Sequence, residues 1–266
     1  MLLLFLAGLL IAVLLYGSAL YKQRKAEENF QFMAEETNIT EDESQGMDEV
    51  PPEPEEIEEE IDILETLGIE IPEKDIDFAK LQEEYPDIYA WIYVPGTQVD
   101  YPVFQHPTDD TFYLNNNADG SAGYPGCIYT ESINSKNFTD PHTVLYGHNM
   151  KNKTMFGSLH NFEDSQVFEE NPYFFIYTPD KTFVYQIFAT YRYPAYHLLY
   201  AFDLSKEGAM KDYQERIIYE VHDMTANIRK DIKLNDDNHI VTLSTCVTGE
   251  PDYRYLVQGV LLNDGV

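Results

Sequence analysis

The sequence contains little cysteine and little positive charge, and each shortage excludes a class of protein. Its 266 residues include two cysteines, too few for the disulfide framework of a small secreted domain or for a cysteine-only metal site. Lysine and arginine total 17 against 47 acidic residues, which gives a formal net charge of −30. Proteins that bind nucleic acid neutralise phosphates with basic side chains, so we expect no nucleic-acid partner.

Signatures of cofactors and metals are also missing. No glycine-rich phosphate-binding loop and no internal repeat occurs along the chain. The seven histidines are scattered, and none lies at His-x-x-x-His spacing or beside a pair of cysteines. We therefore expect an activity that uses no metal and no other cofactor.

The first 25 residues have the composition of a membrane anchor. Residues 2–20 are almost uninterruptedly apolar and uncharged, close to the roughly 20 residues that span a bilayer as a helix. A cleaved signal peptide is the alternative, because Gly17-Ser-Ala19 resembles a cleavage site, but the basic stretch that should precede it is missing. The nearby basic residues follow the apolar run, and the positive-inside rule alone would place that side in the cytoplasm.

The segment that follows is strongly acidic, with seventeen acidic residues and no basic residue between positions 26 and 66. Residues 26–56 have too little apolar surface to offset the entropy lost on ordering, so we expect a disordered, self-repelling stalk. Apolar residues then recur at helical spacing over 57–67 and 76–85, and Gly68 is placed to end the first of these helices. We expect both helices to dock on a domain that spans residues 57–266.

The rest of the chain has the pattern of a mainly β protein with helices. Short β-rich runs are separated by turn signals such as Pro95-Gly96. The expected strands are residues 91–94, 99–105, 127–130, 143–147, 173–178, 182–192, 240–246 and 254–262. About eight short strands predict a closed barrel or a sandwich. Apolar residues on one helical face over 205–227 predict a long helix between the sixth and seventh strands, with Ser205 as its N-cap.

The last two expected strands carry the first candidate site. Cys246 ends one strand and Arg254 begins the next, across a polar loop. A strand pair would hold this thiol beside a permanent positive charge that can stabilise an oxyanion. One alternative is a buried structural thiol with a solvated arginine. Another is a disulfide with Cys127, which begins an apolar strand and is expected in the core.

A second β-rich run ends at Tyr-Gly-His148-Asn-Met. This motif, with Thr-Leu-Ser-Thr-Cys246 and an arginine eight positions later, resembles the sortases, and class B in particular. The motifs Trp-Ile-Tyr-Val-Pro-Gly at 91–96 and Asp-Tyr-Pro-Val at 100–103 extend the resemblance, which covers about residues 81–262. The long helix before the seventh strand is similar to class B and differs from the smaller class A form.

The resemblance implies a sortase-like closed β-barrel and a membrane-anchored cysteine transpeptidase with its catalytic domain outside a Gram-positive cell. Cys246 would attack a sorting motif in an exported surface protein, His148 would protonate the leaving amine, and Arg254 would hold the oxyanion. An amine of the peptidoglycan precursor or cross-bridge would then accept the acyl group. Pilin polymerisation by the same chemistry is one alternative, and a catalytically silent surface-binding barrel is the other.

Four further residues are expected at the site: Tyr146, Ser244, Thr245 and Asp252. The first two stand two positions before the histidine and the cysteine, so they share the same strand faces and are expected to line the substrate groove. The threonine is expected to contact the substrate backbone, and the aspartate to orient the arginine. Ordinary strand packing and a solvated loop position are the alternatives.

Overall fold

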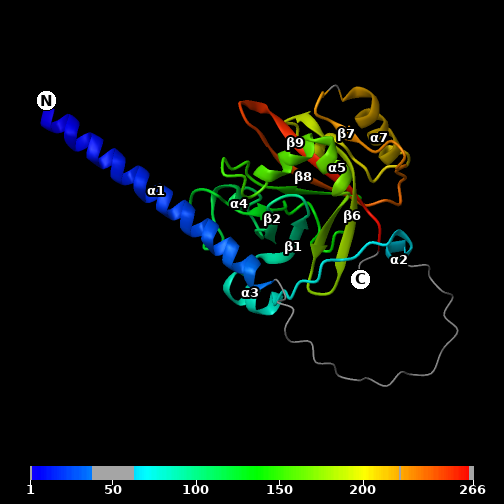
Figure 1. Ribbon diagram of the computed structural model, residues 1–266, viewed down its shortest axis with the longest axis horizontal. Helices are drawn as coiled ribbons and strands as arrows, with labels where there is room; N and C mark the ends of the chain where they lie inside the picture. Colours follow the sequence, from blue (N-terminus) through cyan, green and yellow to red (C-terminus); the bar gives the residue numbers. More distant parts are fainter. Residues whose placement is uncertain (1, 38–62, 222, 264–266) are drawn as a thin grey trace, which may run out of the picture.

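The structure is a computed structural model that describes residues 2–37, 63–221 and 223–263 (Figure 1). The expected stalk between residues 38 and 56 and the first turns of the helix expected at 57–67 lie outside the described residues. What remains of that helix is α2 (Ile63–Leu67), in which Leu64 is buried. The chain leaves α2 through Gly68, whose φ of 63° is the left-handed conformation that favours glycine at a helix end.

Eight strands close into a barrel, as the sequence predicts. The strands of the structure are β1 (Ile88–Val94), β2 (Val99–Phe104), β3 (Ile128–Tyr129), β4 (His142–Tyr146), β5 (Tyr173–Tyr177), β6 (Thr182–Pro194), β7 (Asn227–Ile228), β8 (Ile240–Val247) and β9 (Glu250–Leu261). They are hydrogen-bonded in the order β5-β1-β2-β3-β4-β8-β9-β6, and a β5–β6 pairing closes the ring. The short β7 pairs with β6 and lies outside the closed ring.

The mixed direction of the strands places the ends of β4 and β8 together. These two neighbours run parallel, with Tyr146 opposite Ser244, whereas β8 and β9 run antiparallel, with Cys246 opposite Arg254. The carboxyl ends of β4 and β8 therefore open at the same rim of the barrel as the start of β9. As a result, the residues that follow β4 lie close to the end of β8, almost one hundred positions later in the chain.

Large aromatic side chains fill the barrel, and their burial is a major source of its stability. Trp91 and Phe104 are fully buried, and Phe174 stacks on Tyr185 with the ring centroids 5.0 Å apart. A second apolar cluster lies outside the barrel, between the strands and α7 (Ala209–Glu220). The barrel is thus covered on one face by a helix that packs through its own apolar stripe.

This helix, α7, confirms the prediction of a helix before the seventh barrel strand, but its bounds differ from those expected. It begins after Gly208, whose φ of 77° lies in the left-handed region, and not at Ser205. The hydroxyl of Ser205 instead donates to Asp203, at 2.6 Å. The helix ends at Glu220, so Met224 is exposed and does not continue the apolar stripe.

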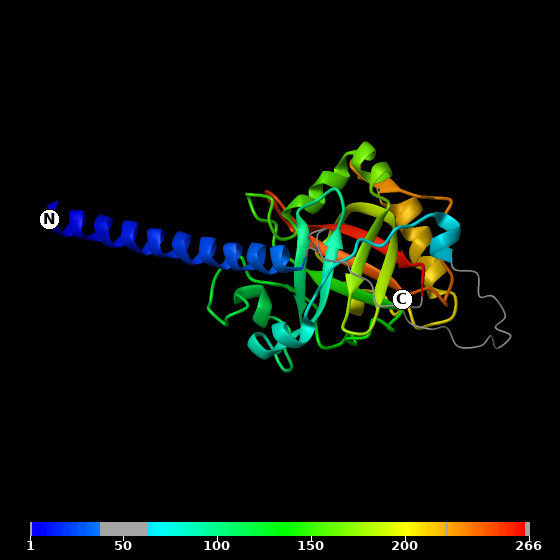
Figure 2. The ribbon, with the colours of Figure 1, turned by 60° about the horizontal axis from the view of Figure 1, so that its bottom comes forward.

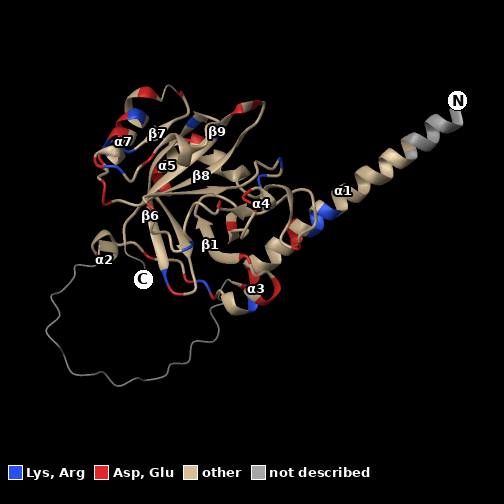
Figure 3. Cartoon of the chain, turned by 180° about the vertical axis from the view of Figure 1, so that it is seen from behind, with Lys and Arg blue, Asp and Glu red and all other residues tan. Residues whose placement is uncertain are grey.

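The other helices are short and lie in the connections. They are α3 (Phe78–Glu84), α4 (Phe112–Asn115), the 3-10 helix η1 (Gly157–Glu163), α5 (Ser165–Glu170) and α6 (Leu198–Ala201). The predicted helix at 76–85 is confirmed as α3, with Asp77 as its N-cap accepting from the Lys80 amide at 2.9 Å. Acidic side chains are spread over these helices and the loops around the barrel (Figure 3).

A single long helix, α1 (Leu2–Glu36), precedes the barrel and projects far beyond it (Figure 2). The expectation of disorder is wrong for residues 26–36, because Phe30 and Met33 are buried against the barrel. Phe30 meets the ring of Tyr101 on β2 edge to face, with centroids 5.8 Å apart. The average composition of this acidic segment did not indicate that two of its apolar residues pack against the barrel.

Among the residues that the structure describes, no helix carries an apolar stretch long enough to cross a membrane. The membrane anchor expected at residues 1–25 therefore has no support in this structure.

Candidate active site

The ends of β3, β4, β6, β8 and β9 form a groove with a volume of about 270 Å³ at one rim of the barrel. Helix α6 supplies part of its wall. The groove is lined by three residues that the sequence singles out for catalysis, Cys246, His148 and Arg254. Because they come from the end of β8, the loop after β4 and the start of β9, the barrel topology alone brings them together.

The two cysteines have opposite environments. Cys246 is exposed in the groove, and both thiols are free, so they do not form a disulfide with each other. Cys127 is 1% exposed, and its Sγ lies 3.7 Å from the carbonyl oxygen of Asn116. Burial raises the pKa of the Cys127 thiol well above its usual value. Cys127 is therefore a core thiol, as predicted, and Cys246 is the thiol that a substrate can reach.

His148 is held by a backbone carbonyl on the far side of the groove. Its Nε2 lies 2.7 Å from the carbonyl oxygen of Leu114, in α4. A carbonyl only accepts, so Nε2 carries the hydrogen and Nδ1 remains for exchange of a proton with another group. The Tyr124 ring packs against the imidazole, with centroids 4.8 Å apart. A Cβ at Gly126, where φ is 68°, would approach the Tyr113 carbonyl oxygen to 2.8 Å, so glycine keeps this side of the site closely packed.

Arg254 is oriented by its own hairpin. Its Nη1 donates to the carbonyl oxygens of Pro251 and Tyr253, each at 2.9 Å. The expected role of Asp252 is not seen, because its carboxylate makes no hydrogen bond or ion pair with Arg254 and it does not line the groove. Instead, the Asp252 carbonyl accepts from the Ala195 amide at 2.8 Å and ties the hairpin to the chain that leads into α6. A planar guanidinium has five N–H donors, so several remain available for a substrate.

The three other predicted residues, Tyr146, Ser244 and Thr245, all line the groove. The ring of Tyr146 stacks on that of Tyr129, with centroids 5.4 Å apart, and burial raises the pKa of both phenols. Thr245 is 2% exposed, and its hydroxyl donates to the Gly147 carbonyl at 2.7 Å. That bond links β8 to the residue before His148, so the Thr245 hydroxyl is committed within the protein.

A histidine–carboxylate pair in the groove was missed by sequence reasoning. Nε2 of His197 lies 2.8 Å from Oε2 of Glu131, and the Tyr200 ring stacks on the imidazole at 4.1 Å. Burial raises the pKa of the Glu131 carboxyl, and the neighbouring His197 opposes this rise. The two residues are 66 positions apart, and no local motif marks either of them.

The arrangement suits acyl transfer through a thiol. It combines a reachable nucleophile, an imidazole with one nitrogen held by the protein, and a guanidinium above the same groove. Within the described part of the chain, no group of three or more histidine, cysteine, aspartate or glutamate side chains is arranged to hold a metal ion.

Comparison with known proteins agrees with this geometry. A family model for the sortase domain matches residues 92–262. Sortase B of Listeria monocytogenes is 28% identical over 185 residues, which cover 68% of this chain and 72% of the relative. The crystal structure of sortase B from Clostridium perfringens superposes with a TM-score of 0.61 at 30% identity, covering 70% of this chain and 99% of that one.

A further solved structure is that of a Streptococcus pyogenes class B sortase involved in pilus biogenesis. It matches with a TM-score of 0.60 and 27% identity, covering 70% of this chain and 98% of that one. The closed barrel, the helix between β6 and β8 and the matched sortase model all agree. The chain therefore belongs to the sortase family and has the fold of its class B members.

Proposed function

We propose that this protein is a cysteine transpeptidase that cleaves a C-terminal sorting motif in exported proteins and joins them to an amine of the cell wall. The observation that carries the proposal is the exposed thiol of Cys246 in a groove also lined by His148 and Arg254. The sortase family match supports the same reaction type. The groove would receive the sorting motif in an extended form.

In the first half-reaction, the Cys246 thiolate attacks the carbonyl carbon of a threonine in the motif, and a C–S bond forms. The carbonyl oxygen becomes an oxyanion, which the Arg254 guanidinium stabilises. When the tetrahedral intermediate collapses, the C–N bond breaks and the His148 imidazolium gives its proton to the leaving amine. The acyl group is then held as a thioester on Cys246.

In the second half-reaction, an amine attacks the thioester carbonyl and gives up a proton to His148. The C–S bond breaks, and Cys246 returns as a thiolate. The proposed amine belongs to a peptidoglycan precursor or cross-bridge. This reaction requires the barrel to work outside the cell, where exported proteins and cell-wall amines meet.

Pilin polymerisation is a second candidate, because one relative of similar fold and 27% identity is a class B sortase involved in pilus biogenesis. The chemistry at Cys246 would be the same. Only the acceptor would differ, being a lysine amine on another subunit. The identity of the amine in the product separates the two candidates.

The proposal is tested with the purified protein and a library of synthetic peptides that contain a threonine at varied positions. We expect cleavage after threonine in a subset of peptides, and faster release of the leaving peptide when a small amine is added. Mass spectrometry of the products identifies the scissile bond and the acceptor. A protein that cleaves no peptide, and whose Cys246→Ala variant binds the same peptides equally well, would instead be a binding barrel.

A further inference from the structure

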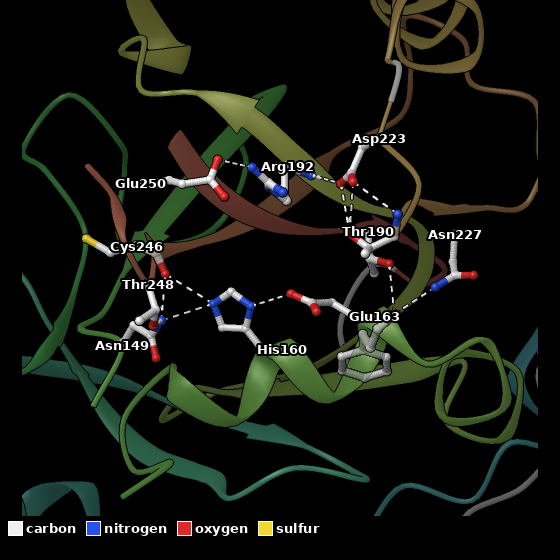
Figure 4. Close-up of polar contacts among 12 residues, drawn as sticks. Asn149, His160, Glu163, Thr190, Arg192, Asp223, Asn227, Cys246, Thr248 and Glu250 are labelled. Carbon is white, nitrogen blue, oxygen red and sulfur yellow. Dashed lines mark hydrogen bonds and ion pairs between the residues drawn. The ribbon is translucent and has the colours of Figure 1, made fainter. Parts of the chain in front are cut away.

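Two side chains lie against the carbonyl oxygen of Cys246, on the side away from its thiol. The Nδ2 of Asn149 donates to the Cys246 carbonyl oxygen at 2.8 Å, and Nε2 of His160 lies 3.1 Å from the same oxygen. Figure 4 shows the thiol pointing away from both of these side chains. The pair therefore contacts the main chain of the nucleophile and leaves its sulfur open to the groove.

Both side chains come from the segment that also carries the catalytic histidine. Asn149 directly follows His148, and His160 lies in η1. The segment is tightly folded, since a Cβ at Gly157 would approach the Met150 carbonyl oxygen to 2.7 Å. A hydrogen bond from Asn149 to Cys246 thus joins the residue beside the proton donor directly to the backbone of the nucleophile.

His160 is itself fixed in place. Its Nδ1 lies 2.6 Å from Oε1 of Glu163, one turn further along η1, where side chains three residues apart share a face. Its ring stacks on Tyr255 of β9, with centroids 4.7 Å apart and planes 23° apart. The His160 side chain is 13% exposed, so the imidazole has little freedom to turn.

The hydrogen-bond roles follow from the donors and acceptors present. An ionised Glu163 only accepts, so Nδ1 of His160 carries a hydrogen. In the neutral ring, Nε2 then accepts, and the Asn149 amide 3.1 Å away is a donor. The other hydrogen of that amide reaches the Cys246 carbonyl. The hydrogen bonds thus form a chain from Glu163 through His160 and Asn149 to Cys246. The Asn149 amide nitrogen also lies 3.2 Å from Oγ1 of Thr248.

We propose that Asn149, His160 and Glu163 are positioning residues for the transfer reaction. They orient the Asn149 amide so that it sets the distance between the Cys246 thiol and His148. The inference rests on the proposed function, but it concerns residues that do not line the groove. Displacing reacting groups by about 1 Å can cost about a hundredfold in rate, so loosening this chain should slow the chemical step.

The test uses two substitutions at one position in the full-length protein. His160→Phe keeps a ring against Tyr255 and removes both hydrogen bonds, whereas His160→Gln keeps one donor and one acceptor. We expect His160→Phe to lower kcat between about tenfold and a hundredfold with KM changed less than about threefold. His160→Gln should recover most of that loss. Thermal melts and the folded fraction are measured for each protein.

A second readout does not depend on the substrate. The rate at which iodoacetamide alkylates Cys246 reports how the thiol is activated, and His160→Phe should lower it together with kcat. Asn149→Asp, which has the same shape but places an acceptor against the Cys246 carbonyl, should slow both rates even if His160→Phe folds poorly. Wild-type protein that alkylates normally but cleaves no peptide would refute the proposed function and leave this test intact.

Three outcomes would overturn the inference. One is wild-type kcat and alkylation rate in folded His160→Phe or Asn149→Asp. Another is a His160→Gln variant as slow as His160→Phe, since the hydrogen bonds would then be irrelevant. The third is a loss of activity in either variant that equals its loss of folded protein.

Discussion

At the scale of single residues, Arg254 is the clearest case in which shape matters as much as charge. Two backbone carbonyls of the hairpin accept hydrogen bonds from one of its nitrogens, so the fold fixes the orientation of the planar guanidinium. Lysine has a compact ammonium on a flexible stem and cannot reproduce a held guanidinium. We therefore expect the geometry of the side chain at this position to be as necessary as its positive charge.

We predict that Arg254→Lys keeps the fold but loses about 10²–10³ in turnover, the range measured when one oxyanion donor is removed from a hydrolase. The loss should appear in both kcat and kcat/KM, because the interaction forms in the transition state. Peptide cleavage by Arg254→Lys and Arg254→Ala, beside their thermal melts, is the measurement. Near-wild-type rates in both variants would remove Arg254 from the mechanism.

The shared position of Cys246, His148 and Arg254 at one groove could be predicted because each lies in a short motif at a strand end. Asn149 and His160 could not, since His160 meets the Cys246 carbonyl across 86 residues of sequence. The predicted contact between Asp252 and Arg254 is not seen, for a related reason. Neighbouring backbone carbonyls compete for a guanidinium, and a sequence does not show which acceptor is geometrically closer.

At the scale of secondary-structure elements, a buried polar network ties α7 to the barrel. Gln258 on β9 donates to Tyr213 of α7 at 2.6 Å and to Thr242 of β8 at 2.7 Å. Nε2 of His142, at the start of β4, lies 2.8 Å from the Thr242 hydroxyl. Its Nδ1 is buried and has no hydrogen-bond partner among the residues that the structure describes, and burial lowers the pKa of His142 to about 3.

This depressed pKa predicts a specific pH dependence of stability. In the unfolded chain a histidine gains its proton near pH 6.5, whereas folded His142 stays neutral down to about pH 3. Between these values the unfolded state binds more protons, so the free energy of unfolding falls as the pH falls. One proton corresponds to a slope of at most about 1.4 kcal/mol per pH unit.

The measurement is urea unfolding of wild type and His142→Gln between pH 7.5 and pH 5. Other titrating groups are common to both proteins, so the difference in slope isolates His142. We expect the variant to lose stability less steeply with acid, by about the slope of one proton. Parallel curves across this range would show that His142 is not kept neutral by the fold.

The strands were predictable because β-branched and aromatic runs alternate with turn signals, and in six of the eight predicted ranges both bounds lie within two residues of the observed strand. The N-cap of helix α7 was predicted three residues too early, since Ser205 has the chemistry of an N-cap but its hydroxyl pairs with Asp203. Gly208, in its left-handed conformation, makes the actual turn into the helix. The local sequence thus predicted that a helix forms here, but not the residue at which the helix begins.

At the level of the whole molecule, α1 packs against the barrel and belongs to the folded domain. Phe30 and Met33 are buried against the barrel, and Asn152, in the loop after His148, donates to Glu27 at 2.9 Å. The domain boundary expected at residue 57 therefore omits part of the core. A composition-based boundary failed here because two apolar residues suffice to dock an acidic helix.

We predict that a protein starting at Lys22 is as stable as the full chain, whereas one starting at residue 38 is less stable. Burying a phenylalanine and a methionine contributes up to about 1.5–3 kcal/mol each, so the second truncation should lose about 2–5 kcal/mol. Thermal and urea melts of the two proteins, with Phe30→Ala in the full chain as a matched control, make the comparison. Identical stabilities would mean that α1 contributes nothing to the barrel.

Cys246 should carry the acyl group during transfer, and the intact mass of the protein after brief exposure to a cleavable peptide tests this directly. We predict an adduct equal in mass to the acyl part of the peptide, located by digestion on Cys246 and removed by added amine. Cys127→Ala should form the same adduct, and Cys246→Ala should form none. Peptide cleavage without an adduct, or an adduct on any residue other than Cys246, would contradict acyl transfer through the Cys246 thiol.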